Sequence, residues 1–420
     1  MNRRSAIVVT GRMPWPLDDG GRIALWQAVW STAQRFDTVL LSLVPAETAA
    51  QPVPEPPASL DVEVIRVPHR PPALPMAVLR GSFGRWPYTL ARYRNPRFDG
   101  ALRRLVVERR PALVLVNSLH TATYIDAVQG TPFVIRQQNL EHRWLERFAG
   151  SRTNPLVAAF ARFQARRMIR TEADLCTRAD LVLSIQDEET RILRALAPAA
   201  WVETVPIGID FSRYFEPARQ TPPVILLVGS YGWPPNDEGA RRFLADGWPC
   251  VRARRPDARL RMIGKDLSSS LADAARAAGA EPAGYVDSMA PEFARATAMV
   301  VPLWVGAGAR VKIVEALAAR LPVVSTTLGA EGLGLEPGRH LLQADGPTGL
   351  GDALLELLGA PARVEEIAGE AHAFARAHFS LDAVARRTND LLEAAIERHA
   401  RRGSGPVRGQ AALRPGGSSP

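Results

Sequence analysis

The chain has 420 residues, 46% hydrophobic and 23% charged, which is ordinary for a globular protein of two or three domains. Its net charge of +9 suits nucleic acids, anionic membranes or phosphorylated substrates, although a general preference for arginine explains part of the excess. No apolar run reaches the roughly 18–20 residues that span a bilayer, the N-terminal run is too short for a signal peptide, and two cysteines make neither a disulfide framework nor a metal cluster, so we expect a cytoplasmic protein.

The first half of the chain alternates short apolar runs with helical patterns, which predicts a parallel sheet covered by helices. The expected strands are 6–10, 38–44, 62–67, 112–116 and 132–136, and the expected helices are 22–34, 98–109 and 156–176. Gly20 and Gly21 end the loop between the first strand and the first helix. Such a loop faces the ligand crevice of an α/β sheet, although Asp-Asp-Gly-Gly alone more often marks a turn.

The segment 76–97 mixes aromatic side chains with arginines and is amphipathic and basic. It is compatible with an anionic membrane surface or with a cover over an acceptor site. Packing of aromatic rings and arginines inside the domain explains the pattern equally well.

Polar residues follow two of the predicted strands. His120 comes shortly after strand 112–116, and Asn139, Glu141 and His142 follow strand 132–136. Loops at the carboxyl ends of parallel strands line ligand crevices. His120 is therefore a candidate ligand contact, although a lone histidine is more often structural.

A proline-rich stretch, 217–223, predicts a linker to a second sheet. The expected elements after it are strand 224–228 with a glycine loop that begins at Gly229, a helix from 239, strand 260–263, helix 289–296 with Asp287 as its cap, and a final helix 379–399. Residues 401–420 are rich in Gly, Pro, Ser and Arg, which predicts disorder.

The most informative stretch is 299–335, which predicts a strand, a glycine loop with Gly306 and Gly308, a helix and a second strand. Arg310 and Lys312 fall in the first helical turn, where cations oppose the helix dipole. An anion bound at that helix end removes the conflict.

Lys312 is one of only two lysines in the chain, which indicates that a compact cation is needed at this position. Glu315 lies three residues later and can face the same side, where its carboxylate would accept hydrogen bonds from ribose hydroxyls. A solvated Lys–Glu pair on a surface helix is the plainer alternative.

The segment VKIVEALAARLPVVST resembles the nucleotide-sugar site of retaining glycosyltransferases with the GT-B fold, family 4 (glycosyl transferases group 1). Glu315 matches the second glutamate of the family motif, and Ala307 stands where the first is usual. The chain is closer to a branch with a Gly-rich loop and Arg-x-Lys before the second glutamate. Tyr285-Val286 after Gly284 and Asn139-Leu140-Glu141 also resemble family segments.

The resemblance implies an α/β fold of two Rossmann-like domains that face a cleft. The implied units are an acceptor-binding domain at 1–205, a nucleotide-sugar-binding domain at 206–380, a helix at 381–400 that crosses back to the first domain, and a disordered tail at 401–420.

The implied activity is retaining, hexosyltransferase-like transfer from a nucleotide diphosphate sugar to a sugar or lipid-linked acceptor, in cell-surface polysaccharide or glycolipid synthesis. The protein would be cytoplasmic or peripheral on the inner face of the cell membrane. Arg310 and Lys312 would stabilise the leaving diphosphate, and His120 would contact the transferred sugar. We expect no metal and no cofactor beyond the co-substrate.

The remaining site residues divide into two sides of the cleft. The donor side would comprise Gly20, Gly21, Gly229, Gly306, Gly308, Tyr285, Val286 and Glu315, and the acceptor side Asn139, Glu141 and His142.

Three alternatives remain open. The chain could hydrolyse or epimerise nucleotide sugars, or it could bind them without catalysis, as Ala307 suggests. Nucleic-acid binding rests on charge alone, because no recognition motif supports it, and we expect no nucleic-acid partner.

Overall fold

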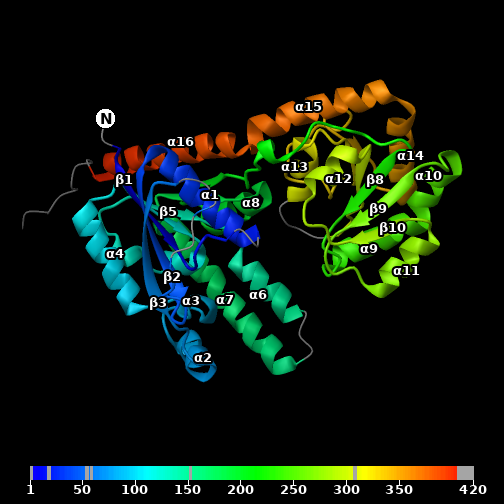
Figure 1. Ribbon diagram of the computed structural model, residues 1–420. Helices are drawn as coiled ribbons and strands as arrows, with labels where there is room; N and C mark the ends of the chain where they lie inside the picture. The colour runs from blue at the N-terminus through cyan, green and yellow to red at the C-terminus, as the bar shows by residue number, and fades with distance from the viewer. Residues whose placement is uncertain are drawn as a thin grey trace, which may run out of the picture.

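The computed structural model describes residues 3–16, 20–52, 56, 60–150, 154–305 and 310–403. The described strands form two sheets, and neighbouring strands are parallel in both (Figure 1). In spatial order the first sheet holds β3 (Val62–His69), β2 (Asp37–Pro45), β1 (Ser5–Thr10), β4 (Leu113–Asn117), β5 (Phe133–Arg136), β6 (Leu181–Ser184) and β7 (Val202–Thr204). The second holds β10 (Glu281–Gly284), β9 (Arg259–Ile263), β8 (Val224–Val228), β11 (Ala298–Val301), β12 (Val323–Ser325) and β13 (Leu342–Gln343).

Helices connect the strands within each unit. The first unit contains α1 (Gly20–Arg35), α2 (Leu74–Phe83), α3 (Tyr88–Ala91), α4 (Pro96–Arg109), α5 (Leu119–Ala122), η1 (Ile125–Ala127), α6 (Glu141–Gly150), α7 (Pro155–Arg178) and α8 (Asp187–Leu196). The second contains α9 (Pro234–Arg242), η3 (Phe243–Gly247), α10 (Trp248–Arg254), α11 (Ser269–Ala277), α12 (Ala290–Arg295), α13 (Val311–Ala318), α14 (Pro347–Gly359) and α15 (Pro361–Phe379), and η2 (Phe211–Arg213) precedes it.

Both sheets are buried on both faces. Along β1, Ile7 and Val9 join one apolar cluster while Ala6 and Val8 join the cluster on the opposite face. Along β8, Ile225 and Leu227 likewise join one apolar cluster, while Leu226 joins the cluster on the opposite face. Continuous apolar strands are expected when helices cover both faces of a parallel sheet. The predicted α/β fold class is therefore confirmed.

The last helix, α16 (Leu381–Gly403), returns from the second unit to the first (Figure 1). Its Asn389 side chain donates to the Ser31 carbonyl oxygen of α1 at 2.9 Å, and Glu393 pairs with Arg4 and Arg35. The helix continues through Gly403, so the prediction of a disordered segment from 401 is wrong for its first three residues. Residues 404–420 lie outside the described part of the chain.

Two local predictions are also wrong. Asp287 does not cap α12, whose N-cap is Met289 without a side-chain hydrogen bond. The helix expected from 239 starts earlier, at Pro234, because proline is well suited to the first helical positions. No helix within the described ranges has the length and apolar character needed to cross a membrane.

Candidate functional site

The second sheet carries a cavity of about 390 Å³ at the carboxyl ends of its strands. The loops after β8, β9, β10 and β11 and the start of α13 build it. The sequence-predicted residues Gly229, Tyr285, Val286, Arg310 and Lys312 all line it. This edge of a parallel α/β sheet is where ligands bind.

Two glycines bring the loops after β8 and β9 together. Gly264 has φ +152°, and a Cβ there would lie 1.6 Å from the carbonyl oxygen of Gly229. Only glycine accommodates such an approach at that backbone angle. The close approach of these two cavity-lining loops therefore depends on Gly264, which the sequence analysis did not single out.

Lys312 points across the cavity from the first turn of α13. Its Nζ donates to the Val228 carbonyl oxygen at 2.9 Å and to Asn236 Oδ1 at 3.1 Å. Both acceptors are uncharged, so burial and the nearby Arg310 charge lower the pKa of Lys312 to about 8. The side chain is thus a half-buried cation without a carboxylate in either of these contacts.

Arg310 is the N-cap residue of α13 and is almost fully buried. Its guanidinium donates to the Leu328 carbonyl oxygen at 2.9 Å. Burial lowers its pKa, while Glu331 and Glu188 act in the opposite direction. The first turn of α13 contains no acidic residue, so the positive end of the helix and two cations coincide.

Glu315 lies outside the lining of this cavity. Its Oε1 accepts a hydrogen bond from the Tyr214 hydroxyl at 3.0 Å, and burial raises its pKa. Lys312 and Glu315 therefore contact different partners, and the contact of Glu315 with a ribose remains a prediction.

A second cavity, about 520 Å³ in volume, lies in the first unit. His120, Asn139 and Glu141 line it together, as do Gly11 of the loop after β1 and Tyr93 beyond α3. The sequence analysis thus identified residues that follow two different strands and that the fold brings to one cavity.

His120 and Glu141 face each other in this cavity, with Nδ1 and Oε1 3.8 Å apart. Burial lowers the pKa of His120 to about 4. Burial and the nearby Glu172 raise the pKa of Glu141 to about 8. Burial therefore favours the uncharged form of both groups, which suits a pair of neutral hydrogen-bonding groups better than an ion pair.

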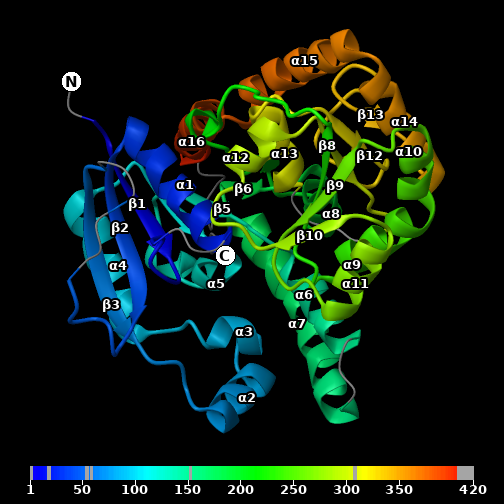
Figure 2. The same cartoon turned by 45° about the vertical axis from the view of Figure 1, so that its right-hand side comes forward.

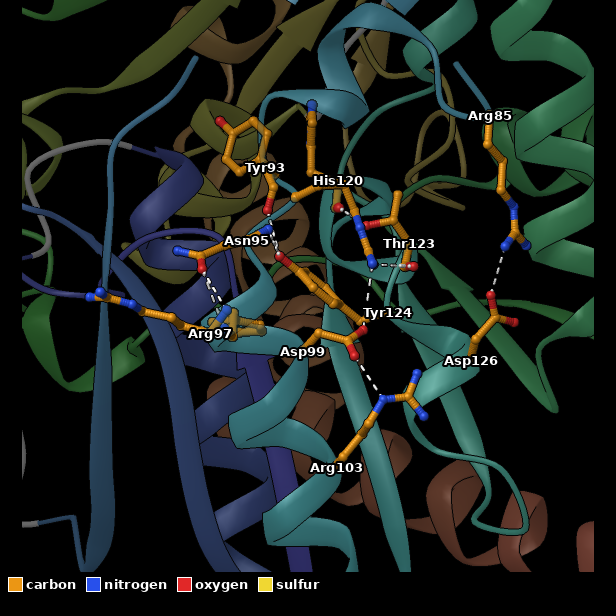
Figure 3. A network of polar contacts seen from close by, with 12 residues as sticks. Arg85, Tyr93, Asn95, Arg97, Asp99, Arg103, His120, Thr123, Tyr124 and Asp126 are labelled. Carbon is orange, nitrogen blue, oxygen red and sulfur yellow. Dashed lines mark hydrogen bonds and ion pairs between the residues drawn. The ribbon is translucent and has the colours of Figure 1, made fainter. Parts of the chain in front are cut away.

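The ring of Tyr93 packs against His120, with centroids 4.6 Å apart. Figure 3 shows how Tyr124 holds that segment: its hydroxyl donates to the Tyr93 carbonyl oxygen at 2.7 Å and accepts from the Asn95 amide at 2.8 Å. Arg94 lies over the Tyr124 ring and donates to the Thr123 carbonyl oxygen at 2.7 Å. This network, absent from the sequence predictions, fixes one wall of the His120 cavity.

His142 does not share the environment of its neighbour Glu141. It is buried, and its Nδ1 bonds with Glu172, which also accepts from Gln137. His142 thus contacts Glu172 and does not line the His120 cavity, and its acceptor-side role remains a prediction.

A third cavity, about 350 Å³, lies between the two units and includes Arg310, together with Ile185 and Gln186 of the first unit. A fourth, smaller cavity is lined by Gln186, which also lines the third cavity, and by Asn139, which also lines the His120 cavity. Shared lining residues thus connect the cavity of Lys312 to that of His120. The cleft predicted between two Rossmann-like domains is present.

Only some of the glycines predicted in two loops of the site lie within the described residues. Gly20 and Gly21 form the first turn of α1, next to residues 17–19, which lie outside the described ranges. Gly306, Ala307 and Gly308 also lie outside them. Among the described residues no group of His, Cys, Asp and Glu is arranged to hold a metal ion.

Comparisons with known proteins agree with this architecture. A comparison with curated proteins finds no match. Sucrose-phosphate synthase (tll1590) from Thermosynechococcus elongatus superposes with a TM-score of 0.62 at 15% identity, over 94% of this chain and 100% of that one. Anabaena Alr3699/HepE in complex with UDP and glucose superposes with a TM-score of 0.59 at 15% identity, over 92% of this chain and 99% of that one.

WaaG, a glycosyltransferase involved in lipopolysaccharide biosynthesis, gives a TM-score of 0.59 at 13% identity, over 92% of this chain and 99% of that one. Likeness at this level of identity establishes the fold. The chain has the two-domain GT-B architecture, and its residues 222–360 match the family model of glycosyl transferases group 1.

Proposed function

We propose that the protein is a retaining glycosyltransferase that moves a sugar from a nucleotide diphosphate sugar to an acceptor. The observation that carries this proposal is the cationic start of α13. Arg310 and Lys312 both line the cavity of the second unit, and Arg310 also lines the cavity between the two units. A helix N-terminus with two added cations is suited to a diphosphate.

The donor would lie in the second unit, residues 206–380. Its diphosphate would replace the uncharged partners of Lys312, which are the Val228 carbonyl and Asn236. Tyr285 and Val286 line the same cavity and would contact the nucleoside. The HepE complex with UDP and glucose supports this class of ligand. Charge that develops on the leaving diphosphate would be stabilised by Lys312, Arg310 and the helix end.

Glu315 remains our candidate for the ribose contact. One of its oxygens accepts from Tyr214, so a ribose hydroxyl would bind the other oxygen or displace the tyrosine. This arrangement makes Glu315 a positioning contact rather than a group that takes part in bond breaking.

The acceptor would lie in the first unit, residues 1–205. His120, held neutral by burial, can donate or accept a hydrogen bond at the transferred sugar. Asn139 and Glu141, which line the same cavity, would orient the acceptor. The likeness to WaaG, which is involved in lipopolysaccharide biosynthesis, supports a cell-surface glycolipid or polysaccharide as the acceptor class.

The experiment begins with a thermal-shift screen of UDP-, GDP-, ADP- and dTDP-sugars, because a specific ligand raises the apparent melting temperature. The stabilising donor is then assayed for transfer with and without acceptors. Transfer with retained anomeric configuration supports the proposal. Rapid turnover without any acceptor would assign a hydrolase or epimerase, and binding without turnover would assign an inactive homologue.

A further inference from the structure

Two helices of the first unit expose large apolar side chains to solvent. Of the twelve large apolar side chains exposed in the described part of the chain, six lie on α2 and the first half of α7. They are Met76, Leu79, Phe83, Leu156, Val157 and Phe163. Phe83 is 86% exposed and Leu156 79%. Clustered exposure of this kind marks an interaction surface.

A surface helix normally turns its large apolar side chains toward the core, and α2 and the first half of α7 do the reverse. α2 buries Ala77 and Gly81 and exposes Met76, Leu79 and Phe83, which recur at helical spacing. In the first half of α7 the buried apolar positions are the small residues Ala158, Ala161 and Ala165, while Leu156 and Phe163 face out. The larger apolar groups therefore point away from the domain core.

Side chains of α7 hold α2 in place. Gln164 donates to the Gly81 carbonyl oxygen at 3.1 Å and accepts from the Tyr88 amide at 2.8 Å. Arg167 bonds the carbonyl oxygens of Gly81 and Gly84. The two helices lie at the same end of the first unit in both views (Figures 1 and 2). We call the exposed side chains of these two joined helices the α2–α7 surface.

Basic residues predominate around this surface, although Asp126 pairs with Arg85 just after α2 and Glu146 is exposed on α6, which packs against α7. The sequence contains no Asp or Glu between Glu63 and Asp99, or between Glu146 and Glu172. Arg80 lies among the exposed apolar residues of α2. On α7 an exposed row of arginines spaced by four residues, Arg162, Arg166 and Arg170, runs beside Leu156 and Phe163. A partner of this surface must be apolar and anionic together.

We propose that the α2–α7 surface docks on an anionic lipid bilayer. Apolar side chains would enter the boundary between headgroups and acyl chains, and the arginines would bind the lipid phosphates. Each basic residue near an anionic leaflet contributes about 1 kcal/mol, and the effect weakens with salt. Side chains on two helices that remain packed on the domain would produce reversible attachment rather than insertion.

The docking surface adjoins the cavity of His120. Tyr88 at the start of α3 bonds α7, while Thr89, Arg92 and Tyr93 in and after α3 line the cavity. If the proposed function holds, an acceptor anchored in the membrane would reach the cavity along α3. The docking itself does not depend on the proposed function, because its test requires no sugar transfer.

The test is sedimentation of the full chain with phosphatidylcholine vesicles, with and without phosphatidylglycerol. The surface variant is Arg80→Gln/Phe83→Ser. The matched control is Arg104→Gln/Val107→Ser, which changes an exposed arginine and an exposed apolar residue at the same spacing on α4. Melting temperatures of the three proteins check that each is folded.

We expect the wild type to bind phosphatidylglycerol vesicles at least about tenfold more tightly than neutral ones, with a loss of binding as salt rises. The surface variant should lose about tenfold in partitioning, and the control should match the wild type. Equal binding to both vesicle types, or an equal loss in both variants, overturns the proposal. A dimer that the surface variant converts to a monomer also overturns it, because the surface would then join two copies of the chain.

Discussion

The ammonium group of Lys312 lies 2.9 Å from the carbonyl oxygen of Val228, the last residue of β8. This contact joins the start of α13 to one of the two central strands of the second sheet. It places a cation where the loops after four strands meet. A nucleotide diphosphate bound there would supply the negative charge that neither Val228 nor Asn236 provides.

The pKa of Lys312 can be measured directly because the chain contains only one other lysine, Lys265. Reductive ¹³C-methylation and NMR should show one lysine that titrates near pH 8, and Lys265→Arg assigns the other signal. A bound diphosphate favours the charged amine and should raise the pKa of Lys312. A Lys312 signal that titrates near its ordinary value of 10.5 in the free protein would contradict the burial of this amine.

The lowered pKa of Lys312 also predicts how the affinity for a diphosphate depends on pH. Below pH 8 Lys312 is charged before the ligand arrives, so affinity for a diphosphate should be highest there. Above pH 8 the free protein loses the proton that the complex keeps, and affinity should fall by up to about tenfold per pH unit. Lys312→Arg cannot titrate in this range, so any binding it retains should not decline between pH 8 and 9.

Asn236→Asp should weaken diphosphate binding by about tenfold or more. The amide Oδ1 accepts from Lys312 and its Nδ2 donates to the Ser230 carbonyl oxygen at 2.9 Å. A carboxylate would lose the second bond, neutralise Lys312 and repel the phosphates. The control is Asn154→Asp, because Asn154 caps α7 and Asp caps a helix equally well. Unchanged calorimetric affinity in Asn236→Asp would exclude this arrangement.

Glu141→Gln should gain stability relative to the wild type as pH rises. The pKa of Glu141 is raised from 4.5 to about 8, so the folded protein binds a proton that the unfolded chain has released. The stability from this proton is complete below pH 4.5 and disappears as pH approaches 8. Over that window the difference in unfolding free energy should change by an amount on the order of a few kcal/mol.

Urea denaturation at pH 5, 6, 7 and 8 measures this difference. Glu146→Gln changes the same residue type at an exposed position of the same helix and is the control. Parallel stability curves for Glu141→Gln and the wild type would mean that Glu141 is ionised in the folded protein.

Tyr124→Phe should loosen the segment that packs on His120. The variant leaves the Tyr93 carbonyl and the Asn95 amide without the hydroxyl that serves both. The loss should be about 1–3 kcal/mol of stability, with faster amide hydrogen exchange in residues 88–95. Tyr231→Phe removes a hydroxyl that donates to the Leu227 carbonyl oxygen in the second unit. Tyr231→Phe should lower stability without changing amide hydrogen exchange in residues 88–95. Equal hydrogen-exchange rates of residues 88–95 in the two variants would contradict the role of Tyr124.

The sequence predicted the parallel sheets well because their strands are continuous apolar runs, such as Val224–Val228. It also identified Arg310 and Lys312, since their charges conflict with the helix dipole. It did not identify Gly264 or Tyr124, whose contacts join segments distant in the chain and leave no local pattern. His142 was predicted beside Glu141 in the site, but neighbouring residues of a helix point in different directions.

The central claim is that the first turn of α13 binds two phosphates. Calorimetric titration of the wild type, Lys312→Ala and Lys265→Ala with a nucleoside diphosphate and its monophosphate tests it most directly, starting with UDP and UMP and extending to guanosine, adenosine and thymidine nucleotides. We expect the wild type and Lys265→Ala to prefer the diphosphate by about tenfold or more, and Lys312→Ala to lose that preference while it remains folded. A preference that survives in Lys312→Ala, or a wild type that binds none of the four diphosphates, would contradict the account.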